Sequence, residues 1–128
     1  MVERIKSEQF DQFVGQIQNV KVEKGKYGEQ YHIEMKPIDV QVMGKTGSMH
    51  EWIGIPATAK ADSIPEGCVL DKYLQMVEMV YKEAKALKGH AEVMSMITGR
   101  KFLFKKMRLG KAFEGKEAKE YWVPFREA

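Results

Sequence analysis

Two glycine-flanked segments of this 128-residue chain combine several lysines with one aromatic ring. Lysine attracts phosphate groups, and an aromatic ring can stack on the face of an unpaired base. We therefore expect both segments to be loops that bind a single-stranded nucleic acid. Alternatively, either ring could fold back to cover apolar surface. The candidate residues are Lys24, Lys26 and Tyr27 in EKGKYGEQ, and Lys111, Phe113 and Lys116 in GKAFEGKEAKE.

Strand-like alternation predicts a second group of binding residues between these loops. In YHIEMKP, the apolar residues share one side of a strand, while His32, Glu34 and Lys36 share the other. In MHEWIGIP, Trp52 lies opposite the two isoleucines. We expect His32, Lys36 and Trp52 to face outward, although a register shift of one residue would bury Trp52 in the core. Packing inside the fold is expected for Trp122.

Positive charge is concentrated in GRKFLFKKMRLGK, residues 99–111, which has six basic side chains and no acidic one. The formal net charge of the chain is +3, and without this segment acidic residues outnumber basic ones. The phenylalanines predict that the first half is a core strand. The second half, from Lys105 through Arg108 to Lys111, leads into the loop that contains Phe113. We expect these three cations at one wall of a binding cleft.

Five strands and one long helix should position these residues. The stretch from residue 13 to residue 37 predicts a hairpin, and MHEWIGIP predicts a third strand. Between Pro65 and Gly89, apolar residues recur at intervals of three and four, which predicts the helix. EVMSMI could add one or two helical turns. RKFLFKKMRL and YWVPFRE predict the last two strands.

This order is similar to that of the five-stranded OB-fold β-barrel, in which a helix connects strands three and four. FVGQIQNVKVEKGKYGEQYHIEMKP, ITGRKFLFKK and YWVP resemble single-stranded DNA-binding OB domains of the replication protein A type and their small phage and archaeal relatives. The resemblance covers roughly residues 10–126. It implies one mainly β domain over residues 1–128, in which 1–9 could be a lead-in segment, with nucleic acid crossing strands two and three.

The leading hypothesis is non-catalytic binding of single-stranded DNA, or RNA, with little sequence preference. In it, basic residues hold the backbone while Tyr27, Trp52 and Phe113 stack on bases. One alternative is an OB-fold module that binds another protein through its methionine-containing helix and binds no nucleic acid. An enzyme of unrecognised type is a third alternative. It is weaker because the sequence has no nucleophile elbow and no recognisable carboxylate dyad.

Metal, cofactor and membrane chemistry are not expected. The three histidines and Cys68 have no spacing that would unite them in a metal site, so isolated surface histidines are predicted. One cysteine cannot form an internal disulfide. The first ten residues contain no apolar run typical of a secretory signal. We expect a cytoplasmic protein, associated with the nucleoid if it binds DNA, and no membrane contact.

Overall fold

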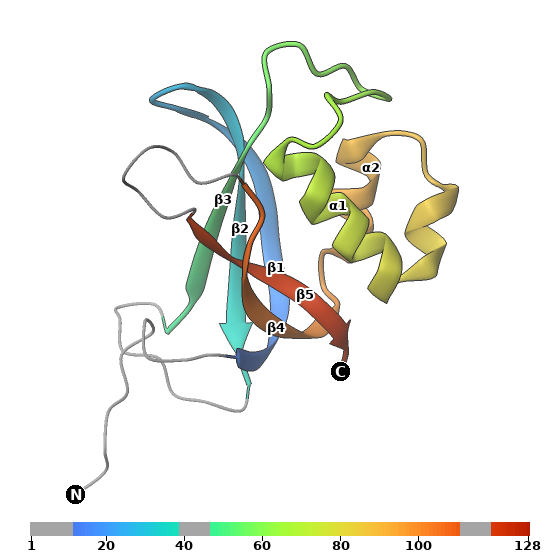
Figure 1. Ribbon diagram of the computed structural model, residues 1–128. Coiled ribbons are helices and arrows are strands. Elements are labelled where there is room, and N and C mark those ends of the chain that lie inside the picture. Colours follow the sequence, from blue (N-terminus) through green and yellow to red (C-terminus); the bar gives the residue numbers. More distant parts are fainter. Residues whose placement is uncertain (1–11, 39–46, 111–118) are drawn as a thin grey trace, which may run out of the picture.

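The chain forms one antiparallel sheet with helices packed to one side of it (Figure 1). The computed structural model describes residues 12–38, 47–110 and 119–128. Across the sheet the strand order is β3-β2-β1-β4-β5. The elements are β1 (Gln12–Gly25), β2 (Gly28–Pro37), β3 (Met49–Gly54), α1 (Val69–Val80), the 3₁₀-helix η2 (Lys82–Ala86), α2 (His90–Ile97), β4 (Lys101–Arg108) and β5 (Glu120–Glu127).

The expected OB-fold barrel is wrong, because the five-stranded sheet is not closed. β3 and β5 are its two edges, and no backbone ladder joins them within the described residues. A side chain spans the gap instead. Glu51 of β3 is buried, and its Oε1 accepts a hydrogen bond of 2.7 Å from the backbone N–H of Trp122 in β5. A carboxylate thus takes up a backbone donor that a neighbouring strand would otherwise satisfy.

The expected single long helix is also wrong. α1 ends at Val80, and Tyr81 has extended backbone angles before η2 begins. The apolar spacing continues past this break. Tyr81 and Ala84 are both buried, but Tyr81 lies in the turn and Ala84 lies in η2, so neither extends α1. The guanidinium of Arg100 lies 4.2 Å from the centre of the Tyr81 ring. Because these residues pack where the chain changes direction, the helical region divides into α1, η2 and α2.

The first hairpin and the three later strands lie where the sequence predicts them. The β1–β2 ladder runs to the pair Gly25–Gly28, so residues 26 and 27 form the turn. Gly28 has a φ of 131°, in the range that favours glycine. Gly15 is needed because a Cβ there would lie 2.7 Å from the Phe13 ring and 3.1 Å from the Lys36 carbonyl oxygen. This close approach lets β1 lie tightly beside β2.

The core lies between the inner face of the sheet and the helices. Phe102 and Phe104 are fully buried, which confirms that the first half of the basic segment is a core strand. The ring of Phe13 stacks on Phe104 at 5.1 Å and meets Trp122 edge-on at 4.8 Å. Trp122 is 7% exposed, so its predicted packing inside the fold is confirmed. Among the described residues, no helix is long and apolar enough to cross a membrane.

Candidate functional site

The outer face of β1, β2 and β3 carries an aromatic cluster in which Trp52 is exposed and the two histidines are half-buried. Cross-strand pairing places Lys21, His32 and Trp52 in one row. Trp52 is 39% exposed, while the neighbouring Ile53 is fully buried. The alternative register, with Trp52 in the core, is therefore wrong. His32 and Trp52 face outward as predicted.

Three rings form this outer aromatic cluster: His32, His50 and Trp52. The rings of His32 and Trp52 are nearly parallel, with an angle of 16° and centres 4.8 Å apart. His50 lies 5.9 Å from Trp52 at 22° and 5.0 Å from His32 at 38°. These nearly parallel rings stack on one another, and part of the Trp52 ring remains exposed beside them. Such a surface suits stacking against another planar group.

Glu23 of β1 holds the cluster in place. Its Oε1 accepts a hydrogen bond of 2.8 Å from the indole N–H of Trp52, and its Oε2 lies 3.2 Å from Nδ1 of His32. The Trp52 hydrogen bond is the main cause of a lowered pKa at Glu23, and the His32 contact adds to it. An ionised carboxylate can only accept, so Nδ1 of His32 carries the hydrogen in this contact. The network fixes the orientation of both rings.

Two histidines meet in this cluster, which corrects the expectation of isolated surface histidines. Nε2 of His32 lies 2.8 Å from Nδ1 of His50. The β2–β3 register pairs His32 with Trp52 and Glu34 with His50, so the histidines are diagonal neighbours on one face. In the sequence, the only sign that the two histidines could meet was that strand alternation placed both on outward positions. Their pairing could not be inferred without the register.

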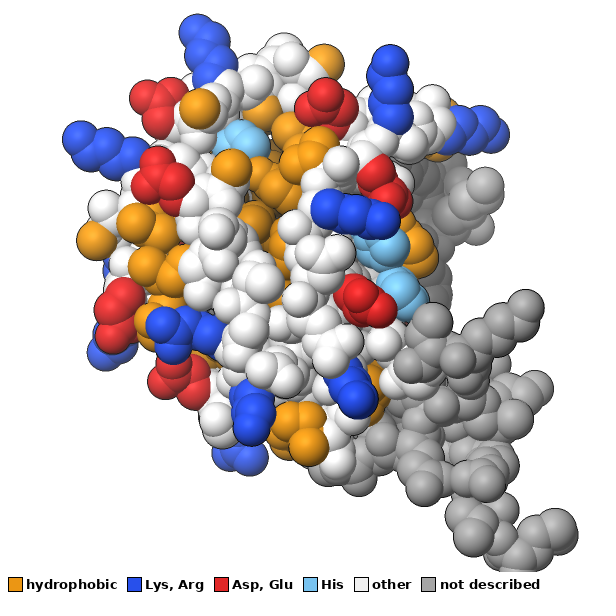
Figure 2. Space-filling view, turned by 180° about the vertical axis from the view of Figure 1, so that it is seen from behind, with side chains coloured by type: hydrophobic (Ala, Val, Ile, Leu, Met, Phe, Trp, Pro, Cys, Tyr) orange, Lys and Arg blue, Asp and Glu red, His pale blue; other side chains and the backbone are white. Residues whose placement is uncertain are grey.

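Further lysines lie on the outer face at some distance from the cluster, toward the start of β1. Gln16 pairs with Lys36 on one side and with Lys101 on the other, so these lysines flank β1. Lys105 faces Gln12 farther along β4, and its Nζ lies 4.0 Å from the centre of the Phe125 ring. Sequence reasoning omitted Lys101 as a site residue, although its alternation with Phe102 indicated an outward position. Figure 2 shows histidine side chains near the right margin and another histidine patch apart from them, with basic and acidic side chains interspersed across the visible surface.

The hairpin tip presents a second aromatic ring to solvent. Tyr27 is 94% exposed, so it does not fold back onto the sheet. Nζ of Lys26 lies 5.5 Å from the centre of this ring, and Lys24 is also exposed. A hollow of about 460 Å³ lies beside the tip. Its lining includes Lys26, Tyr27, Gly54, Ile55, Val69 and Tyr121.

The remaining predicted site residues do not join the cluster. Arg108 lies at the end of β4, with its Nη2 3.9 Å from a carboxylate oxygen of Glu120. Lys111, Phe113 and Lys116 lie outside the described residues. The predicted wall of cations is therefore only partly described. Its described members, Lys105 and Arg108, are separated from β2 by β1.

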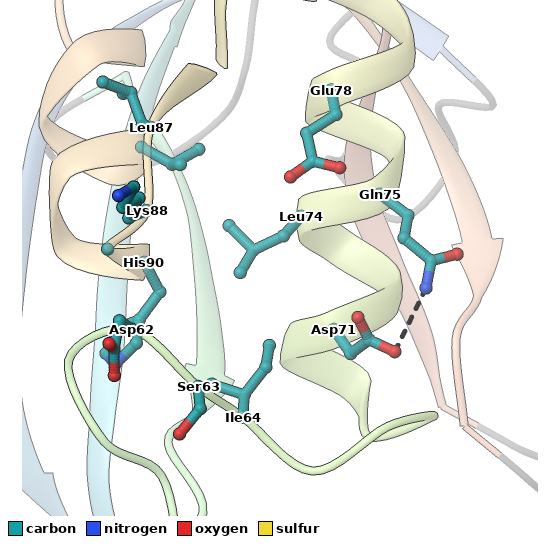
Figure 3. Close-up of a pocket in the computed structure, with 12 residues that line it drawn as sticks. Asp62, Ser63, Ile64, Asp71, Leu74, Gln75, Glu78, Leu87, Lys88 and His90 are labelled. Atoms are coloured by element: carbon teal, nitrogen blue, oxygen red, sulfur yellow. Dashed lines mark hydrogen bonds between the residues drawn. The ribbon is translucent and has the colours of Figure 1, made fainter. Parts of the chain in front are cut away.

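A different hollow, of about 170 Å³, lies between α1, the start of α2 and the preceding loop (Figure 3). Leu74 and Ile64 supply apolar lining, while Asp62, Asp71 and Glu78 supply acidic groups. Asp71 Oδ2 accepts hydrogen bonds from Gln75 and from the backbone of Gly67. Lys88 and His90 also line the hollow, but its three carboxylates outnumber the single lysine, so the lining disfavours phosphate groups. The outer sheet face is the better candidate for a polyanion.

No protein-family model, curated protein or solved structure matches this chain. The case for a function consequently depends on the chemistry of the outer sheet face.

Proposed function

We propose that this protein binds single-stranded DNA or RNA, without catalysis, on the outer face of its sheet. The observation that carries the proposal is the stack of Trp52 on His32, open to solvent and anchored by Glu23. Stacking on an aromatic side chain contributes about 1 to 3 kcal/mol per base and tolerates any base. Open sheets with outward aromatic rings are an established way to hold single-stranded bases.

The cluster is preorganised for stacking. The indole N–H of Trp52 is already satisfied by Glu23, and the parallel His32 ring limits rotation of the indole. A ring that is held before binding loses little conformational freedom when a base arrives. The exposed Trp52 surface is therefore available at low entropic cost.

The outward lysines would supply the contacts to phosphate. Lys21, Lys36, Lys101 and Lys105 lie on the same face as the cluster, and Glu23 and Glu34 offset part of their charge. Phosphate contacts hold a strand without reading its bases, so we expect little sequence preference. Each phosphate neutralised on a single strand should contribute about 0.7 to the slope of log affinity against log salt.

Tyr27 would provide a second stacking ring at the hairpin tip. Its almost complete exposure and the adjacent Lys26 match the combination of ring and cation that single strands bind. α1 offers a protein partner less surface. Met79 is exposed there, but the apolar side chains Leu70, Tyr73, Leu74 and Val77 are buried. Nucleic-acid binding is accordingly the function that we favour.

The test is a titration with labelled homopolymeric DNA and RNA oligonucleotides at two salt concentrations, followed by anisotropy. Trp52→Ala should weaken binding by about 1 to 3 kcal/mol, or roughly 5- to 150-fold. Lys36→Ala should lower the salt slope by about 0.7. Lys85→Ala, an exposed lysine on η2, is the charge-matched control and should leave the affinity unchanged.

Two outcomes would refute the proposal. One is the absence of salt-sensitive binding to any oligonucleotide. The other is binding that Trp52→Ala leaves unchanged while the variant remains folded by circular dichroism. Tryptophan fluorescence gives an independent reading. Because Trp122 is buried, quenching by an unlabelled oligonucleotide should come mainly from Trp52.

A further inference from the structure

We propose that His32 and His50 together bind a divalent transition-metal ion, with Cu²⁺ bound more tightly than Ni²⁺ or Zn²⁺. Neutral imidazole nitrogen suits all three ions, and affinities at such sites rise from Ni²⁺ to Cu²⁺ and fall again at Zn²⁺. The inference is independent of nucleic-acid binding. It depends on how two ring nitrogens on adjacent strands are placed and oriented.

The distance between the two nitrogens is close to that of a chelating pair. Nε2 of His32 and Nδ1 of His50 are 2.8 Å apart. Two imidazole nitrogens bound to one Zn²⁺ at about 2.0 to 2.1 Å, in tetrahedral geometry, would be about 3.3 Å apart. To bind one ion, each ring would have to turn by roughly 35° from the direct line between the two nitrogens, and the nitrogens would move slightly apart. Both rings lie on the outer face, so an ion could approach from solvent.

Glu23 prepares His32 as a ligand. Its Oε2 accepts from Nδ1–H of His32, which leaves the lone pair of Nε2 directed at His50. A carboxylate that orients a histidine in this way commonly supports metal ligands and raises their basicity. When both rings are neutral and Nδ1 of His32 carries its hydrogen, Nδ1–H of His50 is the donor to Nε2 of His32. Metal binding moves the His50 hydrogen to its Nε2, so both ligands are neutral imidazoles.

The site offers two protein ligands. Among the described residues, no group of three or more histidine, cysteine, aspartate or glutamate side chains is arranged to hold a metal. The other coordination positions would be filled by water, which favours an exchangeable ion over a structural one. A bound ion would also add positive charge beside the exposed Trp52 ring.

Trp52 provides the readout because its ring stacks on both histidines. The experiment titrates the full chain with Cu²⁺, Ni²⁺ and Zn²⁺ separately, without nucleic acid, and follows tryptophan fluorescence and calorimetry. We expect saturable binding at one ion per chain, with the tightest binding for Cu²⁺. His50→Gln should weaken Cu²⁺ binding at least 10-fold, and His32→Gln likewise.

The matched control is His90→Gln. His90 lies at the start of α2, where its Nδ1 contacts the Tyr31 hydroxyl, so its replacement should leave Cu²⁺ affinity unchanged. Electron paramagnetic resonance on the unaltered chain adds a test that needs no variant. It should show nitrogen coupling from two imidazoles on Cu²⁺. Absent coupling, or equal weakening by His50→Gln and His90→Gln, would overturn the proposal.

Discussion

Replacing Glu51 by alanine should destabilise the fold strongly, although Glu51 is a charged residue on a short edge strand. The side chain is 6% exposed. Its Oε1 accepts from the backbone N–H of Trp122 at 2.7 Å, and its Oε2 accepts from the N–H of Trp52 at 3.1 Å. Nζ of Lys119 lies 3.7 Å from Oε2. The carboxylate therefore links β3 to β5 where the sheet has no backbone ladder.

The expected loss follows from these two hydrogen bonds. Alanine would leave the Trp122 N–H buried without an acceptor, which costs about 1 to 3 kcal/mol. The N–H of the partly exposed Trp52 can turn to water, so its loss should cost about 0.5 to 1.5 kcal/mol. Removing the exposed Lys119 contact adds little. We expect the free energy of unfolding to fall by about 2 to 4 kcal/mol, and by less in Glu51→Gln, which keeps one acceptor oxygen.

Urea denaturation followed by tryptophan fluorescence at neutral pH would measure this change. Glu83→Ala, an exposed glutamate on η2, is the matched control and should alter the free energy of unfolding by less than about 0.5 kcal/mol. A Glu51→Ala variant as stable as that control would show that Glu51 does not link β3 to β5. If the alanine variant does not fold, the ordering of Glu51→Gln below the control decides the question.

Three further predictions concern stability. Burial raises the pKa of Glu51 above that of an exposed glutamate, so the part of the stability that depends on its protonation is full below the unfolded-state pKa and is lost as pH rises through the folded-state pKa, while its two backbone hydrogen bonds persist at neutral pH. Glu51→Gln should flatten this slope in urea unfolding across pH. The buried Tyr73 hydroxyl has no hydrogen-bond partner among the described residues. Tyr73→Phe should therefore leave the free energy of unfolding unchanged or raise it by up to about 1 kcal/mol. A clear loss of stability would show that the hydroxyl does have a partner. Gly15→Ala should cost about 1 to 3 kcal/mol because its Cβ would meet the Phe13 ring, whereas Gly54→Ala, with open space, should cost much less by the same assay.

Local sequence pattern predicted the strands and several side-chain directions. Alternation along a strand has a period of two whatever the rest of the fold does. It therefore placed His32 and Trp52 outward and Phe102 and Phe104 in the core, and the structure agrees. Glycines in the first hairpin likewise indicated its turn. These features depend on neighbours in sequence, and the sequence contains that information directly.

Helical periodicity was a weaker guide, because spacing alone does not show where a helix ends. Tyr81 and Ala84 continue the apolar intervals of α1, yet they are buried after the chain has turned into η2. Closure of the sheet was equally beyond local pattern. Glu51 shares a strand face with Ile53, and this charge among apolar residues was the available sign of an unusual contact. Only the position of Trp122 showed what the carboxylate binds.

The sequence by itself determined which residues could form a binding face, because side-chain type and strand alternation are local properties. The tertiary structure decided which of them meet. The register between β2 and β3 joins His32 to His50, and the long β1 brings Glu23 within hydrogen-bonding distance of Trp52. Partners separated by 9 to 29 residues are united by strand pairing. That pairing depends on the packing of the whole sheet, which no short stretch of sequence contains.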